Sequence, residues 1–139
     1  AADEAVQFLQ SFNYPADLLP QIHHAIAAHS FSANIPAGTV EARIVQDADR
    51  LEAIGAIGIA RCFLTGGSMG TPLYDPGDPF ALDRKLDDKS FTLDHFYVKL
   101  FKLVDTMQTD AGRAEAERRT EYMQDFLQRL ADEIGASAR

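Results

Sequence analysis

The sequence has only one cysteine, Cys62, and no apolar run long enough to cross a membrane. A single thiol excludes a disulfide within the chain and fits a reducing compartment, so we expect a cytoplasmic protein. A membrane-spanning helix would need about 20 consecutive apolar residues. The chain also lacks a basic start followed by a hydrophobic stretch, which would mark a signal peptide. These absences argue against a disulfide-stabilised secreted domain and against a membrane protein.

Positive charge is scarce in the chain. Its 13 lysines and arginines face 21 aspartates and glutamates, which gives a net charge of −8 and an isoelectric point near 4.8. This balance argues against general binding of a nucleic-acid polymer or an anionic membrane, because neither polyanion would be attracted. A small phosphorylated substrate remains compatible with it, since a bound dication reverses the local field.

Alternating hydrophobicity, internal repeats and low-complexity segments are also missing, whereas helical spacing of apolar residues recurs along the chain. The spacing predicts helices over residues 2–12, 17–29, 40–64, 90–107 and 109–134. We expect Asp17 and Thr109 to cap two of them and Gly135 to end the last. With 139 residues the chain is long enough to bury a core, so we predict a single all-α domain over residues 1–139.

An acidic motif lies within the segment 44–61, IVQDADRLEAIGAIGIAR, around which the chain is organised. Asp47 and Asp49 offer the oxygen ligands that divalent cations prefer, and the guanidinium of Arg50 matches phosphate oxygens. Because residues two apart on a helix point in different directions, we expect only one of the two aspartates to bind a metal ion. The alternative is that both are surface acids at a helix end and that Arg50 forms a weak salt bridge.

Two glycines, Gly55 and Gly58, follow the motif, and each weakens a helix by about 1 kcal/mol relative to alanine. That cost predicts either close packing against another helix or a break just after the motif. If the helix is continuous, Arg61 lies on the same face as Arg50. Pairing of Arg61 with Glu52 or another acid is the alternative.

The connection over residues 65–89 is long, polar and rich in glycine and proline, a composition that more often borders a site than fills a core. Its Gly66-Gly67 turn does not match the GxxxxGK[ST] phosphate loop, and the chain has no HxxxH pair for a zincin-type metal site. Cys62 has no basic partner evident in the sequence, so we expect it to be a buried apolar residue.

Several stretches of the sequence together resemble a known family. They are His29-Ser30-Phe31, Glu41-Ala42, the segment 44–61, HFYVKL over 95–100, and Met107 to Thr109. These stretches resemble the HD-domain superfamily of metal-dependent phosphohydrolases, in the bacterial branch typified by the YedJ and YpgQ proteins. The resemblance implies an HD-like helical bundle and a divalent metal (Mn, Mg, Ni or Fe). It also implies hydrolysis of a nucleotide or another small phosphoester, by attack of a metal-activated water on phosphorus.

The resemblance also implies roles for residues of the acidic motif. Asp49 matches the aspartate that binds the metal, directly before a basic residue. Arg50 matches that basic residue, which lies near the substrate phosphate, where it would stabilise the charge that develops on the phosphate oxygens. Asp47 is left to orient a ligand or to contact the substrate.

Three further residues are candidates by the same resemblance. His29 belongs to a turn near the family's cleft and is a candidate proton donor or phosphate contact; the alternative is a histidine that caps a helix C-terminus. His95 and Lys99 are four residues apart and therefore share a helix face. The family places this helix beside the cleft, which predicts that both bind substrate, whereas an exposed lysine beside packing residues is the alternative.

One part of the family pattern is missing. The family takes its name from a His-Asp dipeptide preceded by another histidine, and no His-Asp dipeptide occurs in these 139 residues. We therefore expect an N-terminal part of the domain to be missing, with Asp49 as the one family metal ligand present. A true truncation predicts no activity and an exposed apolar surface that favours homo-oligomers. The alternative function is a non-catalytic helical binding module or an inactive fragment of the fold.

Overall fold

The chain is helical in a computed structural model that describes residues 1–30 and 34–139. Its elements in order are α1 (Ala2–Ser11), α2 (Leu19–Ala28), α3 (Val40–Leu51), α4 (Gly55–Ser68), α5 (Asp94–Val98), the 3-10 helix η2 (Leu100–Thr106) and α6 (Asp110–Ile134). No strand occurs in the described residues, so the prediction of an all-α, HD-like fold is confirmed. None of the described helices is both long and apolar enough to span a membrane.

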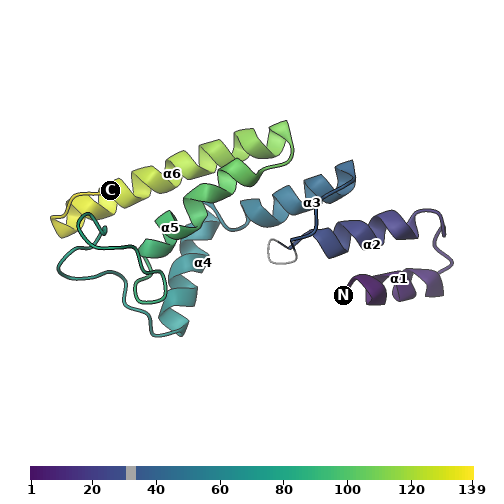
Figure 1. The fold of residues 1–139 in the computed structure, drawn as a ribbon, viewed down its shortest axis with the longest axis horizontal. Helices are drawn as coiled ribbons and strands as arrows, with labels where there is room; N and C mark the ends of the chain where they lie inside the picture. Colours follow the sequence, from purple (N-terminus) through teal and green to yellow (C-terminus); the bar gives the residue numbers. More distant parts are fainter. Residues whose placement is uncertain (31–33) are drawn as a thin grey trace.

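The helices form an elongated arrangement with α1 and α2 at one end and the C-terminus at the other (Figure 1). Helix α1 packs on α2, and α2 packs on α3. At the opposite end, α4 and η2 pack against the long helix α6. The hydrophobic core lies in this second part and consists of Ile54, Ile59, Phe80, Leu93, Phe96, Leu100, Leu103, Met107, Ala116, Met123, Leu127 and Ala131. Helix α1 has no buried residue.

The glycines after the acidic motif mark a break between α3 and α4, as one of the two sequence interpretations proposed. Gly55 begins α4 with φ +74°, a left-handed conformation that glycine adopts without strain. A Cβ on Gly58 would lie 2.3 Å from the carbonyl oxygen of Ala53, so the chain needs glycine there to turn tightly. Because α3 and α4 are separate helices, the condition under which Arg61 would lie on the same face as Arg50 is not met.

Two other expectations about helix limits are also wrong. Asp17 does not cap α2; it lies in a turn, and Leu18 is the N-cap residue without a side-chain hydrogen bond. The helix expected over 90–107 begins only at Asp94, and at Lys99 the backbone leaves α-helical geometry and continues as the 3-10 helix η2. At the long helix α6, by contrast, the Thr109 cap and the left-handed Gly135 stop are confirmed.

The connection between α4 and α5 is held by a buried ion pair. Asp94, 1% exposed, accepts two hydrogen bonds from the guanidinium of Arg84, at 2.6 and 2.8 Å, and one from the Asp87 backbone N–H at 2.6 Å. The base of the connection is closed by backbone hydrogen bonds from Thr92 to Pro72 and from Leu93 to Leu73, each 3.0 Å long. The long polar connection is therefore held in a defined conformation by side-chain and backbone hydrogen bonds.

Replacing Arg84 with methionine is expected to lower the free energy of unfolding by about 3–5 kcal/mol, because it leaves the buried Asp94 carboxylate without its cation. Urea unfolding followed by circular dichroism measures the change. Arg129→Met is the matched control: Arg129 is exposed, so its loss should change the free energy of unfolding by no more than about 0.5 kcal/mol. Equal effects of the two changes would contradict the role of the pair.

Candidate functional site

The first aspartate of the acidic motif, Asp47, joins α3 to the start of α6. It is 3% exposed and accepts hydrogen bonds from the backbone N–H groups of Gln108 and Thr109, both 2.8 Å long, and from the Thr109 hydroxyl at 2.7 Å. A carboxylate at a helix N-terminus is favoured by the unpaired N–H groups and the helix dipole. Asp47 is therefore neither a surface acid nor open to a ligand along these bonds.

The close approach of Asp47 to α6 depends on Gly112. A Cβ at Gly112 would lie 2.3 Å from Oδ2 of Asp47 and 2.9 Å from its Cγ. The Gly112 backbone N–H in turn donates to the Thr109 hydroxyl at 3.0 Å. Glycine is unfavourable inside a helix, yet Gly112 is what lets the carboxylate of Asp47 reach the N-terminus of α6.

The other two motif residues differ in exposure. Asp49 is exposed on α3, whereas Arg50 is 8% exposed and donates a hydrogen bond to the backbone carbonyl of Thr106. Burial lowers the pKa of Arg50, and the charges of Asp47 and Asp49 act in the opposite direction. The guanidinium thus anchors α3 to η2, and Asp49 is the carboxylate of this motif that faces solvent.

The histidine of the HSF motif lies at the junction of α2 and α3. His29 is the C-cap residue of α2, and its Nδ1 lies 2.6 Å from the carbonyl oxygen of Ile26. Next to it, Gln46 of α3 donates to the carbonyl of Ala28 at 2.9 Å. His29 therefore makes the local contact expected of a capping residue. Phe31, the last residue of that motif, lies outside the described residues.

A charged pocket of about 660 Å³ lies between α4, the connection and α5. Its lining includes both His95 and Lys99, which sequence analysis had paired as substrate-binding candidates. The full lining is Ala53, Gly58, Arg61, Cys62, Thr65, Gly66, Met69, Thr71, Asp88, Lys89, Thr92, His95, Lys99 and Leu100. The acidic motif is not part of it, although Ala53, three residues beyond Arg50, is.

Sequence reasoning missed three residues of this charged pocket as site residues: Arg61, Asp88 and Lys89. For Asp88 and Lys89 the available signal was the composition of the 65–89 connection, which predicted that it borders a site but not which of its residues do. Pairing of Arg61 with Glu52 or another acid was one of two alternatives; its guanidinium donates to the backbone carbonyl of Glu52 at 3.1 Å. The fold brings these groups together by folding the connection back onto α4.

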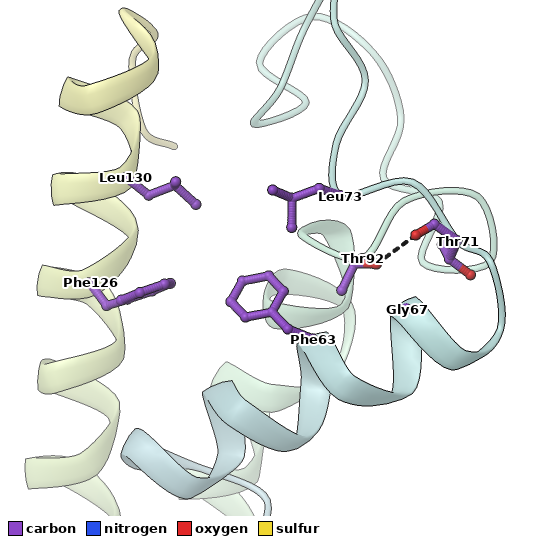
Figure 2. Close-up of a pocket in the computed structure, with 7 residues that line it drawn as sticks. All are labelled: Phe63, Gly67, Thr71, Leu73, Thr92, Phe126 and Leu130. Atoms are coloured by element: carbon purple, nitrogen blue, oxygen red, sulfur yellow. Dashed lines mark hydrogen bonds between the residues drawn. The ribbon is translucent and has the colours of Figure 1, made fainter.

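A second pocket, of about 390 Å³, is apolar (Figure 2). It lies between α4, α6 and the connection, and its lining residues are Phe63, Gly67, Thr71, Leu73, Thr92, Phe126 and Leu130. Thr71 and Thr92 line both pockets, and the Thr92 hydroxyl donates to the carbonyl of Pro72 at 3.1 Å. Since no charged side chain lines it, this pocket does not suit a phosphorylated ligand.

Cys62 lines the charged pocket and is half-buried, so it is less buried than the sequence predicted. Burial raises the pKa of its thiol to about 11. Its sulfur lies 3.9 Å from the carbonyl oxygen of Thr92. The thiol is therefore protonated at neutral pH and is a poor nucleophile.

The described residues contain no group of three or more histidine, cysteine, aspartate or glutamate side chains that could hold a metal ion. Asp49 on its own does not make a metal centre, because such centres need several convergent ligands. Among the three residues of the acidic motif, Asp49 is thus the one carboxylate exposed to solvent, and it lies outside the lining of the charged pocket.

Comparison with known proteins shows similarity along most of the chain. No protein-family model matches it. The uncharacterised protein YpgQ of Bacillus subtilis is 41% identical over 96 residues, which cover 69% of this chain and 41% of YpgQ. The matched stretch thus covers less than half of that curated relative.

Solved structures of YpgQ and of an HD-superfamily hydrolase are also similar to this chain. The crystal structure of Bacillus subtilis YpgQ in complex with ADP matches with a TM-score of 0.76 at 33% identity, over 96% of this chain and 61% of that one. An HD-superfamily hydrolase from Bacillus thuringiensis matches with a TM-score of 0.77 at 37% identity, over 98% of this chain and 63% of that one.

Gly112→Ala tests the contact between Asp47 and α6. Helix propensity alone predicts stabilisation by about 1 kcal/mol. We expect the opposite, a loss of about 1–3 kcal/mol, because the added methyl group displaces the buried carboxylate from its hydrogen bonds. The control is Gly67→Ala in α4, where a Cβ meets nothing within 4 Å and stability should hold or rise. Urea unfolding of both variants measures the effects, and stabilisation by Gly112→Ala would refute the contact.

Cys62 is expected to react slowly with iodoacetamide. With a pKa of about 11, roughly one thiol in a thousand is ionised at pH 8. The labelling rate of the folded protein should rise about tenfold per pH unit between pH 8 and 10, as measured by mass spectrometry. A rate that levels off near pH 9, as for a thiol with the ordinary value of 9.0, would show that burial does not act on this group.

Proposed function

We propose a function from one premise: this chain belongs to the HD superfamily, in its YpgQ-like branch. We infer that the protein is a metal-dependent phosphohydrolase that acts on a nucleotide or another small phosphoester. A relative of the branch, Bacillus subtilis YpgQ, was crystallised with ADP, and a further relative is an HD-superfamily hydrolase. Transfer of a nucleotide ligand to this protein is part of the proposal.

The observation that carries the proposal is the charge of the 660 Å³ pocket. Arg61, Lys89, Lys99 and His95 line it, against the single carboxylate of Asp88. The lining is therefore net positive, although the chain as a whole carries a net charge of −8. Guanidinium and ammonium groups donate charge-assisted hydrogen bonds to phosphate oxygens, and the volume lies in the range of about 300–1,000 Å³ typical of ligand pockets.

The proposed roles follow from where the residues lie. His95 and Lys99 bind the substrate from the pocket wall, together with Arg61 and Lys89. Because the hydrogen bonds of Asp47 all hold the start of α6, we propose that Asp47 positions the acidic motif rather than contacting the substrate.

Asp49 is proposed as the one metal ligand among the described residues, with the charge of Arg50 beside it as the group that stabilises phosphate. We propose His29 as a proton donor or phosphate contact through Nε2, since its Nδ1 lies 2.6 Å from the carbonyl oxygen of Ile26. In the family the metal supplies the activated water. The described residues supply only part of such a metal centre.

Hydrolysis and binding assays on the purified full-length protein test this function. We expect release of phosphate or pyrophosphate from nucleotides in the presence of Mn²⁺, Mg²⁺, Ni²⁺ or Fe²⁺. Asp49→Ala should lower the rate by on the order of 100-fold or more, because a metal ligand is lost. Lys99→Met should raise KM about tenfold, which corresponds to the loss of one charge-assisted hydrogen bond. Asp105→Asn, which changes an exposed carboxylate on η2, is the control and should leave both constants unchanged.

The outcomes separate the enzyme from the binding module. If the protein binds nucleotides but hydrolyses them with none of the four metal ions, it is a non-catalytic nucleotide-binding module and the proposed enzyme activity is refuted. Neither binding nor hydrolysis would refute the proposed function altogether.

A further inference from the structure

We propose that Asp88 is a positioning residue that determines which ring nitrogen of His95 meets the ligand in the charged pocket. The proposal rests on the proposed function, since it concerns the same pocket, and it names a residue that neither the family pattern nor the sequence indicated. Asp88 lies on the connection, whereas His95 lies on α5, seven residues later.

The two side chains form a direct pair. Nδ1 of His95 lies 2.9 Å from Oδ2 of Asp88, and the side chains are 32% and 30% exposed. An ionised carboxylate only accepts hydrogen bonds, so Nδ1 must carry the hydrogen in this contact. In the neutral imidazole the other nitrogen, Nε2, then holds a lone pair and is the hydrogen-bond acceptor.

The buried pair Arg84–Asp94 sets the register of this contact. Asp94 directly precedes His95, and it accepts the backbone N–H of Asp87, which directly precedes Asp88, at 2.6 Å. The same carboxylate is held by the bidentate Arg84 guanidinium. One buried group therefore fixes the backbone on both sides of the His95–Asp88 pair, so the pairing is built into the fold rather than a chance surface contact.

As a consequence, the charged pocket offers the ligand both hydrogen-bond donors and a hydrogen-bond acceptor. Arg61, Lys89 and Lys99 are donors only and suit the anionic part of a phosphoester. The Nε2 atom of a neutral His95 is an acceptor and suits an O–H group, from a ligand hydroxyl or from a water bound beside the phosphate. Asp88, by holding the hydrogen on Nδ1, is what makes Nε2 an acceptor.

The tautomer of His95 is directly measurable in the full-length protein with ¹⁵N-labelled histidine. Long-range ¹H–¹⁵N spectra at pH 8.5 are expected to show His95 with its hydrogen on Nδ1. In Asp88→Leu the side chain has no acceptor for the hydrogen on Nδ1, so the hydrogen is expected to move to Nε2, where free neutral histidine mainly carries it. Asp83→Leu, which changes an exposed carboxylate of the same connection, should leave the tautomer unchanged. An Nε2–H tautomer in the unmodified protein, or no change in Asp88→Leu, would overturn the proposal.

Binding of ADP, measured by isothermal titration, tests the consequence for the ligand. Asp88→Leu is expected to weaken binding about tenfold, because the Nε2 atom of His95 then carries the hydrogen and an acceptor facing the ligand becomes a donor. In a His95→Ala background the same change should have little further effect, since Asp88 acts through the ring. An equal loss in both backgrounds would overturn the positioning role. A protein that binds no ADP would refute the proposed function, whereas the tautomer measurement would still decide the role of Asp88.

Discussion

The carboxylate of Asp47 is the constraint on which the arrangement of the acidic motif depends. It accepts three hydrogen bonds at the start of α6, and it does so from 62 positions away along the chain from Thr109. Together with the bond from Arg50 to Thr106, it fixes the end of α3 against the junction of η2 and α6. The orientation of Asp49, the exposed carboxylate between them, follows from these two anchors.

A second ionic contact organises the other half of the site. The Arg84–Asp94 pair folds the connection back onto α5, and its surroundings raise the pKa of Arg84, chiefly through the hydrogen bonds to Asp94. Burying such a pair costs desolvation free energy, which close bidentate geometry offsets. The pair fixes the connection as one wall of the charged pocket, where Asp88 and Lys89 are lining residues.

The helices and the family could be predicted from the sequence, because periodic spacing, the Thr109 cap, the Gly135 stop and the motif pattern are local signals. The roles of buried polar groups could not. Nothing near Asp47 in the sequence shows that its partners are residues 108 and 109, and nothing near Asp94 shows that it pairs with Arg84. The 90–107 segment has helical spacing, yet its α-helix begins only at Asp94 and ends at Val98. Long-range hydrogen bonds of this kind are a property of the folded chain, not of a sequence window.

The uneven distribution of buried side chains implies unequal local stability. Helix α1 buries no residue and packs on α2, whereas α6 contributes six buried positions along its length. Amide hydrogens of α1 are then expected to exchange with solvent through local opening at little free-energy cost, while those in the middle of α6 exchange only when the whole core opens. The chain thus behaves as cooperative units of different strength, with the charged pocket belonging to the stronger one.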